Sequence, residues 1–179
     1  GIGYIQSLKD AGYDITGGEM TLLGAGGAAS SIAVQAALDQ VPALHIVNRR
    51  GRSWENANRL AALINRQTGC RADVTDLADT KAVQEVIQKS SLLTNATSIG
   101  MAPHAGASPI ADPSCFHKDL FVSDIIYNPR QTKLLADAQQ AGCRTANGLY
   151  MLLYQGAAAF SIWTGQDMPI GDIRDRFFS

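Results

Sequence analysis

The sequence contains few cysteines, and none of them forms a recognisable metal or disulfide pattern. Its three cysteines, Cys70, Cys115 and Cys143, are odd in number and lie far apart in the 179-residue chain. No CxxC pair is present, which excludes the common zinc and thiol-redox motifs as well as a disulfide-stapled fold. We interpret the three thiols as buried or incidental, and we expect no metal site.

The sequence also lacks long apolar runs and an excess of charge of either sign. No stretch reaches the roughly 18 apolar residues of a membrane helix, and the N-terminal residues do not resemble a signal peptide. A formal net charge of −1 provides no basic surface for nucleic acid. With 46% hydrophobic residues, the chain is long enough to bury one core. We expect a soluble cytoplasmic domain that binds neither membranes nor nucleic acid.

A glycine-rich loop at residues 24–29 lies between a short apolar run and a helical pattern. This context of strand, tight turn and helix is the one in which a GxGxxA match indicates a dinucleotide site. Gly24 permits the turn, Gly26 lets a pyrophosphate approach the backbone, and Ala29 lets helix and strand pack closely. The same kind of loop also joins ordinary strands to helices. The residues expected to face the cofactor are Gly24, Ala25, Gly26, Gly27 and Ala28.

Strand and helix patterns alternate along the rest of the chain. Such alternation predicts a parallel sheet with right-handed crossovers. The fold class is therefore α/β, a Rossmann-type doubly wound sheet of six parallel strands with helices on both faces. The apolar segment 148–163 is expected to pack on this sheet and against whatever precedes Gly1. The expected strands are residues 19–23, 43–47, 70–74, 91–95, 120–125 and 143–146.

The end of the second strand, Asn48-Arg49-Arg50-Gly51, is where Rossmann folds select their cofactor. An acidic residue here would bind the ribose 2′-hydroxyl of NAD, whereas arginines suit the 2′-phosphate of NADP. The two arginines favour NADP, although a solvated basic loop is the plainer interpretation. The long loop after residue 95 is a second candidate ligand site, because ligands bind beyond the carboxyl ends of parallel strands. His45, inside the second strand, is expected to be a packed residue.

Several separated motifs together resemble the shikimate dehydrogenase family, specifically its quinate/shikimate dehydrogenase branch. They occur in the family's order and span nearly the whole chain. Each motif is modest by itself, but the ordered set is specific. The motifs are GAGGA at 24–28, NRR at 48–50, NATSIGM at 95–101, YNP at 127–129 with TKLL at 132–135, NGLYMLLYQGA at 147–157 and WTG at 163–165.

The resemblance implies an enzyme that moves a hydride between a nicotinamide cofactor and a ring hydroxyl of shikimate or quinate. It implies that NADP, or alternatively NAD, binds the glycine loop and Asn48, Arg49 and Arg50. Thr97 and Ser98 would then lie under the cofactor. Further implied roles, each with a plain packing alternative, are Gly148 and Met151 beside the nicotinamide, Gln155 on a substrate hydroxyl, and Tyr127 lining the substrate cleft.

Two departures from the family pattern qualify this resemblance. An acid commonly follows the basic pair in the dual-cofactor branch, and here Gly51 takes that position, which weakens the case for NAD. The family's catalytic lysine and aspartate belong to an N-terminal substrate domain, and no residue of this chain occupies their motifs. We therefore expect residues 1–18 to be a connecting helix and turn, residues 19–179 to be the dinucleotide-binding domain with C-terminal helices, and the chain to bind cofactor without catalysing turnover. A stand-alone nucleotide-binding module is the alternative.

Overall fold

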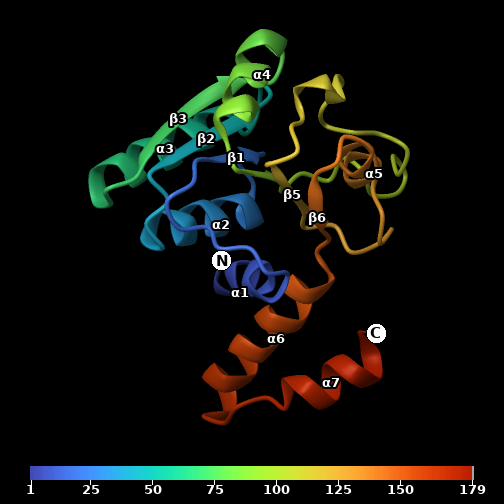
Figure 1. Ribbon diagram of the computed structural model, residues 1–179. Helices are drawn as coiled ribbons and strands as arrows, with labels where there is room; N and C mark the ends of the chain where they lie inside the picture. Colours follow the sequence, from blue (N-terminus) through green and yellow to red (C-terminus); the bar gives the residue numbers. More distant parts are fainter. Residues whose placement is uncertain (179) are drawn as a thin grey trace.

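A computed structural model describes residues 1–178, which form a six-stranded sheet flanked by helices (Figure 1). All strand pairs are parallel, and the spatial order is β3-β2-β1-β4-β5-β6. The order reverses direction between β1 and β4, the topological switch point of a doubly wound sheet. The expected α/β fold is confirmed. The strands are β1 (Met20–Leu23), β2 (Ala43–Asn48), β3 (Arg71–Asp76), β4 (Leu92–Asn95), β5 (Phe121–Asp124) and β6 (Arg144–Ala146).

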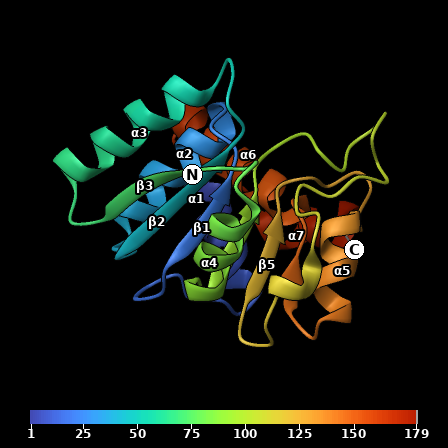
Figure 2. The same ribbon diagram turned by 90° about the horizontal axis from the view of Figure 1, so that it is seen from above.

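Helices cover both faces of the sheet, with α4 on one face and α2 on the other (Figure 1, and Figure 2 from the α4 side). Two buried clusters match these two faces. The helices alternate with the strands along the chain, as expected. The helices are α1 (Ile2–Asp10), α2 (Gly27–Leu38), α3 (Trp54–Gln67), α4 (Thr80–Lys89), α5 (Lys133–Gln140), α6 (Leu149–Thr164) and α7 (Ile170–Phe177), with a short 3-10 turn at Pro113–Cys115.

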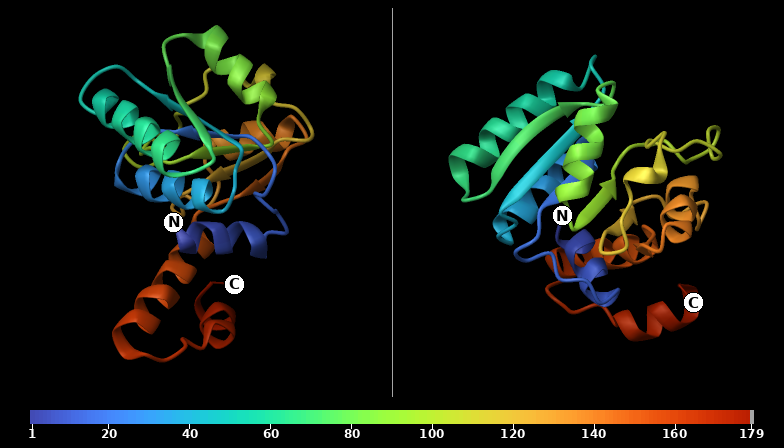
Figure 3. Two further views of the ribbon diagram at one scale, coloured as in Figure 1. Left: turned by 90° about the vertical axis from the view of Figure 1, so that its left-hand side faces the viewer. Right: turned by 45° about the horizontal axis from the view of Figure 1, so that its top comes forward.

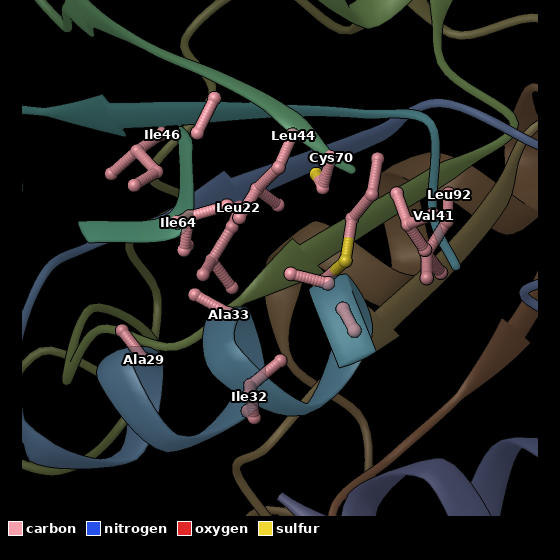
Figure 4. Packing of buried hydrophobic residues seen from close by; sticks show 14 of the residues in the cluster. Leu22, Ala29, Ile32, Ala33, Val41, Leu44, Ile46, Ile64, Cys70 and Leu92 are labelled. Carbon is pink, nitrogen blue, oxygen red and sulfur yellow. The ribbon is translucent and has the colours of Figure 1, made fainter. Parts of the chain in front are cut away.

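The central strands are buried at every position because both faces of a parallel sheet are covered. Leu22, Leu44 and Ile46 point toward α2, where they meet the fully buried Ile32 and Ala33 (Figure 4). Alternate residues of the same strands point toward α4 and α5. Burying one such side chain contributes about 1.5–3 kcal/mol, so this double-sided core is the main source of stability.

Helix α1 is attached to the middle of the sheet by a buried hydroxyl cluster. The Tyr4 hydroxyl forms hydrogen bonds with Thr94 Oγ1 and with Ser123 Oγ, the latter at 2.8 Å. Ser123 also donates to Thr94 at 3.0 Å, so every hydroxyl has a partner. Burial raises the pKa of Tyr4, which keeps the phenol protonated.

Helix α6 departs from the expected packing on the sheet. Its first turn contacts the core through Met151, but its main neighbour is α1. The helix extends beyond α1 on the side away from the sheet, followed by α7 (Figure 3). Ile162 and Trp163 near its end are 80% and 83% exposed. The expectation that the whole apolar segment covers the sheet is therefore wrong, because only Leu153 and Ala157 of this helix are buried. None of the helices between residues 1 and 178 is both long and apolar enough to cross a membrane.

Candidate functional site

A cleft of about 450 Å³ opens beyond the carboxyl ends of β1, β2 and β4. This is the switch point of the sheet, where open α/β folds bind their ligands. The structure brings the glycine loop, the end of β2 and the loop after β4 together in this one cleft. Its lining residues are Leu23, Gly24, Ala25, Gly26, Val47, Asn48, Arg49, Ser53, Leu77, Ala96, Thr97, Ser98, Ile99, His104 and Pro109.

The two cleft-lining glycines of the loop have different physical reasons to be glycine. Gly24 has φ of +103°, and a Cβ there would lie 3.0 Å from Thr97 Cγ2 and 3.1 Å from the Ala96 carbonyl oxygen. Gly24 is thus required by the fold. Gly26 has extended backbone, and a Cβ there would meet no protein atom within 4 Å. The protein's own packing does not require glycine at Gly26, whereas a ligand that contacts the backbone would.

Helix α2 presents its N-terminus at this loop. It begins at Gly27, and its first turn contains no acidic residue. Unpaired amides and the helix dipole at such a terminus favour an anion. Ala29 is fully buried against the core, so the helix packs close to the sheet as expected. Gly27 and Ala28 are exposed at the start of the helix and do not line the cleft.

Asn48 lies at the end of β2 and organises the loop that follows. It is buried, and its side-chain amide donates to the Arg49 carbonyl oxygen at 3.2 Å and to Ser53 Oγ at 3.1 Å. Its own carbonyl accepts from the Leu77 amide at 3.0 Å. Asn48 therefore links the ends of β2 and β3 and fixes the position of the following arginine.

The charge of the cleft is positive. Two of its lining residues are basic, Arg49 and His104, and no aspartate or glutamate lines the cleft. Arg49 forms no ion pair among residues 1–178, and its side chain is exposed. The cleft thus contains a guanidinium that has no ion-pair partner among the described residues.

Arg50 lies elsewhere. It does not line the cleft; its Nε donates to Asp76 Oδ2 at 2.6 Å, and its guanidinium carbon is 4.7 Å from the Trp54 ring centroid. Asp76 also accepts a hydrogen bond from the Ala78 amide, and this bond, followed by the contact with Arg50, lowers the pKa of the Asp76 carboxyl. The two adjacent arginines therefore have different environments.

Thr97 and Ser98 line the cleft on a loop that Asn95 holds in place. The Asn95 side-chain oxygen accepts from the Thr97 amide at 3.0 Å and from Thr97 Oγ1 at 2.7 Å. Its side-chain nitrogen donates to both carboxylate oxygens of Asp124 at 3.1 Å. Asp124 is buried and also accepts from the Ile126 amide and from Thr132 Oγ1. Burial raises the pKa of Asp124 despite these donors. Through its hydrogen bonds, the carboxyl joins the loops after β4 and β5.

The residues expected at the nicotinamide and the substrate lie outside this cleft. Gly148 caps α6 against the end of β5, and Met151 is half-buried against the core. Tyr127 is 49% exposed. Gln155 is exposed and lines a separate groove between α1, α2 and α6. The structure thus brings residues 24–26 of the glycine loop together with Asn48, Arg49, Thr97 and Ser98 in one cleft. Gly148, Met151, Tyr127 and Gln155 do not line that cleft.

Several lining residues were not predicted from the sequence. His104 and Pro109 belong to the Pro- and Gly-rich loop after β4, which was singled out only as a whole. Ser53 precedes α3 and carried no binding motif. Leu77 carried none either, because it follows an edge strand whose position beside β2 depends on the sheet order. Asn56 supports the loop from α3 by donating to the Ala25 carbonyl, a contact across 31 residues that no local pattern reveals.

Comparison with known proteins finds relatives along nearly the whole chain. Residues 148–176 match the family model for the shikimate 5′-dehydrogenase C-terminal domain. The chain is 43% identical over 178 residues to a shikimate dehydrogenase (NADP(+)) of Listeria innocua, covering 99% of this chain and 61% of that protein. It is 44% identical over 170 residues to a quinate/shikimate dehydrogenase of Escherichia coli, covering 95% of this chain and 59% of that protein.

A solved structure agrees with these matches. The shikimate 5-dehydrogenase of Listeria monocytogenes, crystallised in complex with shikimate and NAD, superposes with a TM-score of 0.94 at 43% identity. The superposition covers 97% of this chain and 60% of that chain. The chain thus spans about 60% of the length of the relatives that it matches.

The parallel sheet, the glycine loop at the switch point and the positive cleft define a dinucleotide-binding domain of the Rossmann type. The relatives identify it further. The chain belongs to the shikimate dehydrogenase family and corresponds to the C-terminal part of its members.

Proposed function

We propose that this chain binds NADP(H), with NAD(H) as the weaker alternative, and forms the cofactor half of a dehydrogenase. The observation that carries this proposal is the cleft itself, in which glycine backbone and the unpaired Arg49 converge and no carboxylate is present. The open space at Gly26 and the free N-terminus of α2 suit the pyrophosphate. Arg49 suits the 2′-phosphate, which only NADP carries.

The reaction that we propose for the whole protein is oxidation of a ring hydroxyl of shikimate or quinate, or the reverse reduction. The nicotinamide, when bound, supplies or accepts the hydride. Within this chain, Thr97 and Ser98 would support the cofactor from the loop that Asn95 fixes, and Gly148 and Met151 would border its nicotinamide end. Gln155 would contact a substrate hydroxyl, and Tyr127 would line the substrate side.

The proton of the reacting hydroxyl requires groups outside this chain. No lysine or aspartate lines the described cleft, and the family's catalytic pair belongs to a further, N-terminal domain. We infer that residues 1–18 connect to that domain and that residues 19–179 form the dinucleotide-binding domain. The small-molecule substrate would lie between the two.

A nucleotide-binding module without catalysis is the second candidate, because the cleft is complete without any acid–base pair. The two candidates share cofactor binding and differ in turnover. Calorimetric titration of the purified chain with NADPH and with NADH tests the shared part, and absence of binding by either nucleotide would contradict both. Assays with shikimate and quinate on the chain extended by the upstream encoded segment then separate the two.

A further inference from the structure

Asp76 lies beside the cofactor cleft although the sequence offers no reason to assign it a role there. It is the last residue of β3 and pairs in register with Asn48 at the end of β2. The next residue, Leu77, lines the cleft and donates its amide to the Asn48 carbonyl at 3.0 Å. The carboxyl is therefore at the end of the cleft where the ribose of a dinucleotide is expected.

The carboxylate of Asp76 is held by its own turn and does not depend on Arg50 for its position. Oδ1 accepts from the Ala78 amide at 3.0 Å, and the Asp76 carbonyl accepts from the Asp79 amide at 3.0 Å. Oδ2 remains for the Arg50 Nε at 2.6 Å, while Trp54 lies against the same guanidinium. Arg50 thus contacts both Asp76 and Trp54 and does not line the cleft that Arg49 lines.

We propose that Asp76 is a specificity-determining residue of the cofactor site, which lowers its preference for NADPH over NADH by holding Arg50 away from the 2′-phosphate. This inference rests on the proposed function. Arg49 then binds the 2′-phosphate, and Arg50 links the ends of β2 and β3 through its contact with Asp76. The acid that the sequence lacks after the arginine pair comes instead from the neighbouring strand.

The physical basis is competition between two anions for one guanidinium. An exposed ion pair is weak in itself, but transferring Arg50 to the 2′-phosphate breaks both the Asp76 contact and the Trp54 contact. The fixed carboxylate also repels a dianion brought near it. NADH carries no 2′-phosphate, so its affinity does not increase when Arg50 is released. The ratio of NADPH affinity to NADH affinity therefore measures the competition between Asp76 and the 2′-phosphate for Arg50.

The test replaces Asp76 with asparagine, which keeps the oxygen that accepts from the Ala78 amide and removes the charge. Dissociation constants for NADPH and NADH are measured by calorimetric titration of the wild type and D76N at the same ionic strength. We expect NADPH to bind roughly three- to tenfold more tightly to D76N, because one charge-assisted contact is gained. NADH affinity should change by less than about twofold, since only the 2′-phosphate senses Arg50.

Two further variants make the result specific. Asp79→Asn removes a nearby carboxylate that caps α4 and has no arginine partner, and it should leave the affinity ratio unchanged. The double variant D76N/R50A should lose the gain, because the released guanidinium is absent. An unchanged ratio in D76N, or an equal gain in D79N, overturns the inference. If the wild type binds neither nucleotide, the proposed function fails instead.

Discussion

At the scale of single residues, the two adjacent arginines of one motif have different environments. Arg49 and Arg50 are equivalent in the sequence, and the NRR motif predicts that both bind the cofactor. The structure places only Arg49 in the cleft and pairs Arg50 with Asp76. The difference arises from the position of β3 beside β2, which a local motif does not contain.

Arg49→Ala should weaken NADPH binding and leave NADH binding nearly unchanged. A charge-assisted contact contributes roughly 1.5–3 kcal/mol when shielded and about 1 kcal/mol when exposed. Because Arg49 is exposed, we expect a loss of about fivefold or more in NADPH affinity. Arg52→Ala is the matched control, since Arg52 lies in the same loop but does not line the cleft. Equal losses of NADPH affinity in the two variants would mean that the general positive charge of the loop, and not a specific contact of Arg49, determines binding. Added salt should reduce the difference in NADPH affinity between the wild type and Arg49→Ala.

A second residue-scale prediction concerns His45, which is buried with carboxylates on both sides. Nδ1 is 2.9 Å from Asp73 Oδ2, and Nε2 is 3.1 Å from Glu19 Oε2. The hydrogen bond with Asp73 is the largest cause that raises the pKa of His45; burial opposes it, and Glu19 adds to it. A raised folded-state pKa means that the stabilisation is fully present below the ordinary histidine value near 6.5 and is lost as the pH rises through the raised value.

The measurement is the free energy of unfolding in urea, determined from below pH 6.5 upward. The wild type should lose stability relative to His45→Gln as the pH rises above about 6.5. Asp73→Asn should shrink this pH dependence, because it removes the main partner. Parallel pH profiles for the wild type and His45→Gln would show that the imidazole gains nothing from its two carboxylates.

At the scale of elements, the sequence predicts what local periodicity controls and misses what depends on neighbours. The six strands and most helices were predicted because glycine and proline interrupt clear apolar patterns. The packing of α6 was not predicted, because an apolar composition does not determine which surface the helix covers. The cleft was partly predicted because the glycine loop is a recognisable local motif. Leu77 and Asp76 were not predicted, because the pairing of β3 with β2 places them beside the cleft.

The start of α6 provides an element-scale prediction. Gly148 lies against β5, so that a Cβ there would overlap the Ile125 carbonyl. Both groups are backbone and cannot move aside like a side chain. Gly148→Ala should therefore cost about 1–3 kcal/mol of stability through forced displacement, measured by urea unfolding. It should also weaken nucleotide binding, because we propose that the displaced turn borders the nicotinamide end.

The control lies in the same helix. Gly156 has no atom within 4 Å of a built Cβ, so Gly156→Ala should stabilise the chain by about 0.5–1 kcal/mol through helix propensity. If both variants have the same effect, the close approach at Gly148 does not matter for stability. Their opposite signs would establish that contact, and not helix propensity, selects glycine at Gly148.

At the scale of the whole molecule, the described residues form the cleft that we propose for the cofactor, and no lysine or aspartate lines it. The sheet, its covering helices and the complete cleft are all formed by residues 1–178. The relatives are longer, and this chain matches about 60% of their length. Gln155, which we propose contacts the substrate, faces a groove apart from the cleft.

The last prediction is that this chain folds and binds NADPH but does not oxidise shikimate or quinate. General acid–base assistance contributes ~10²–10⁴-fold, and positioning of the substrate contributes effective molarities up to ~10⁵–10⁸ M. We expect the chain to lack the acid–base assistance, because no lysine or aspartate lines its cleft, and to lack the positioning, because we infer that the substrate lies between this domain and a further one. Absorbance of NADPH formed from NADP and shikimate, with concentrated purified chain, is the measurement, and the chain extended by its upstream encoded segment is the positive control. A saturable rate in the usual range of about 1–10³ s⁻¹ from the chain itself would mean that it holds its own acid–base pair.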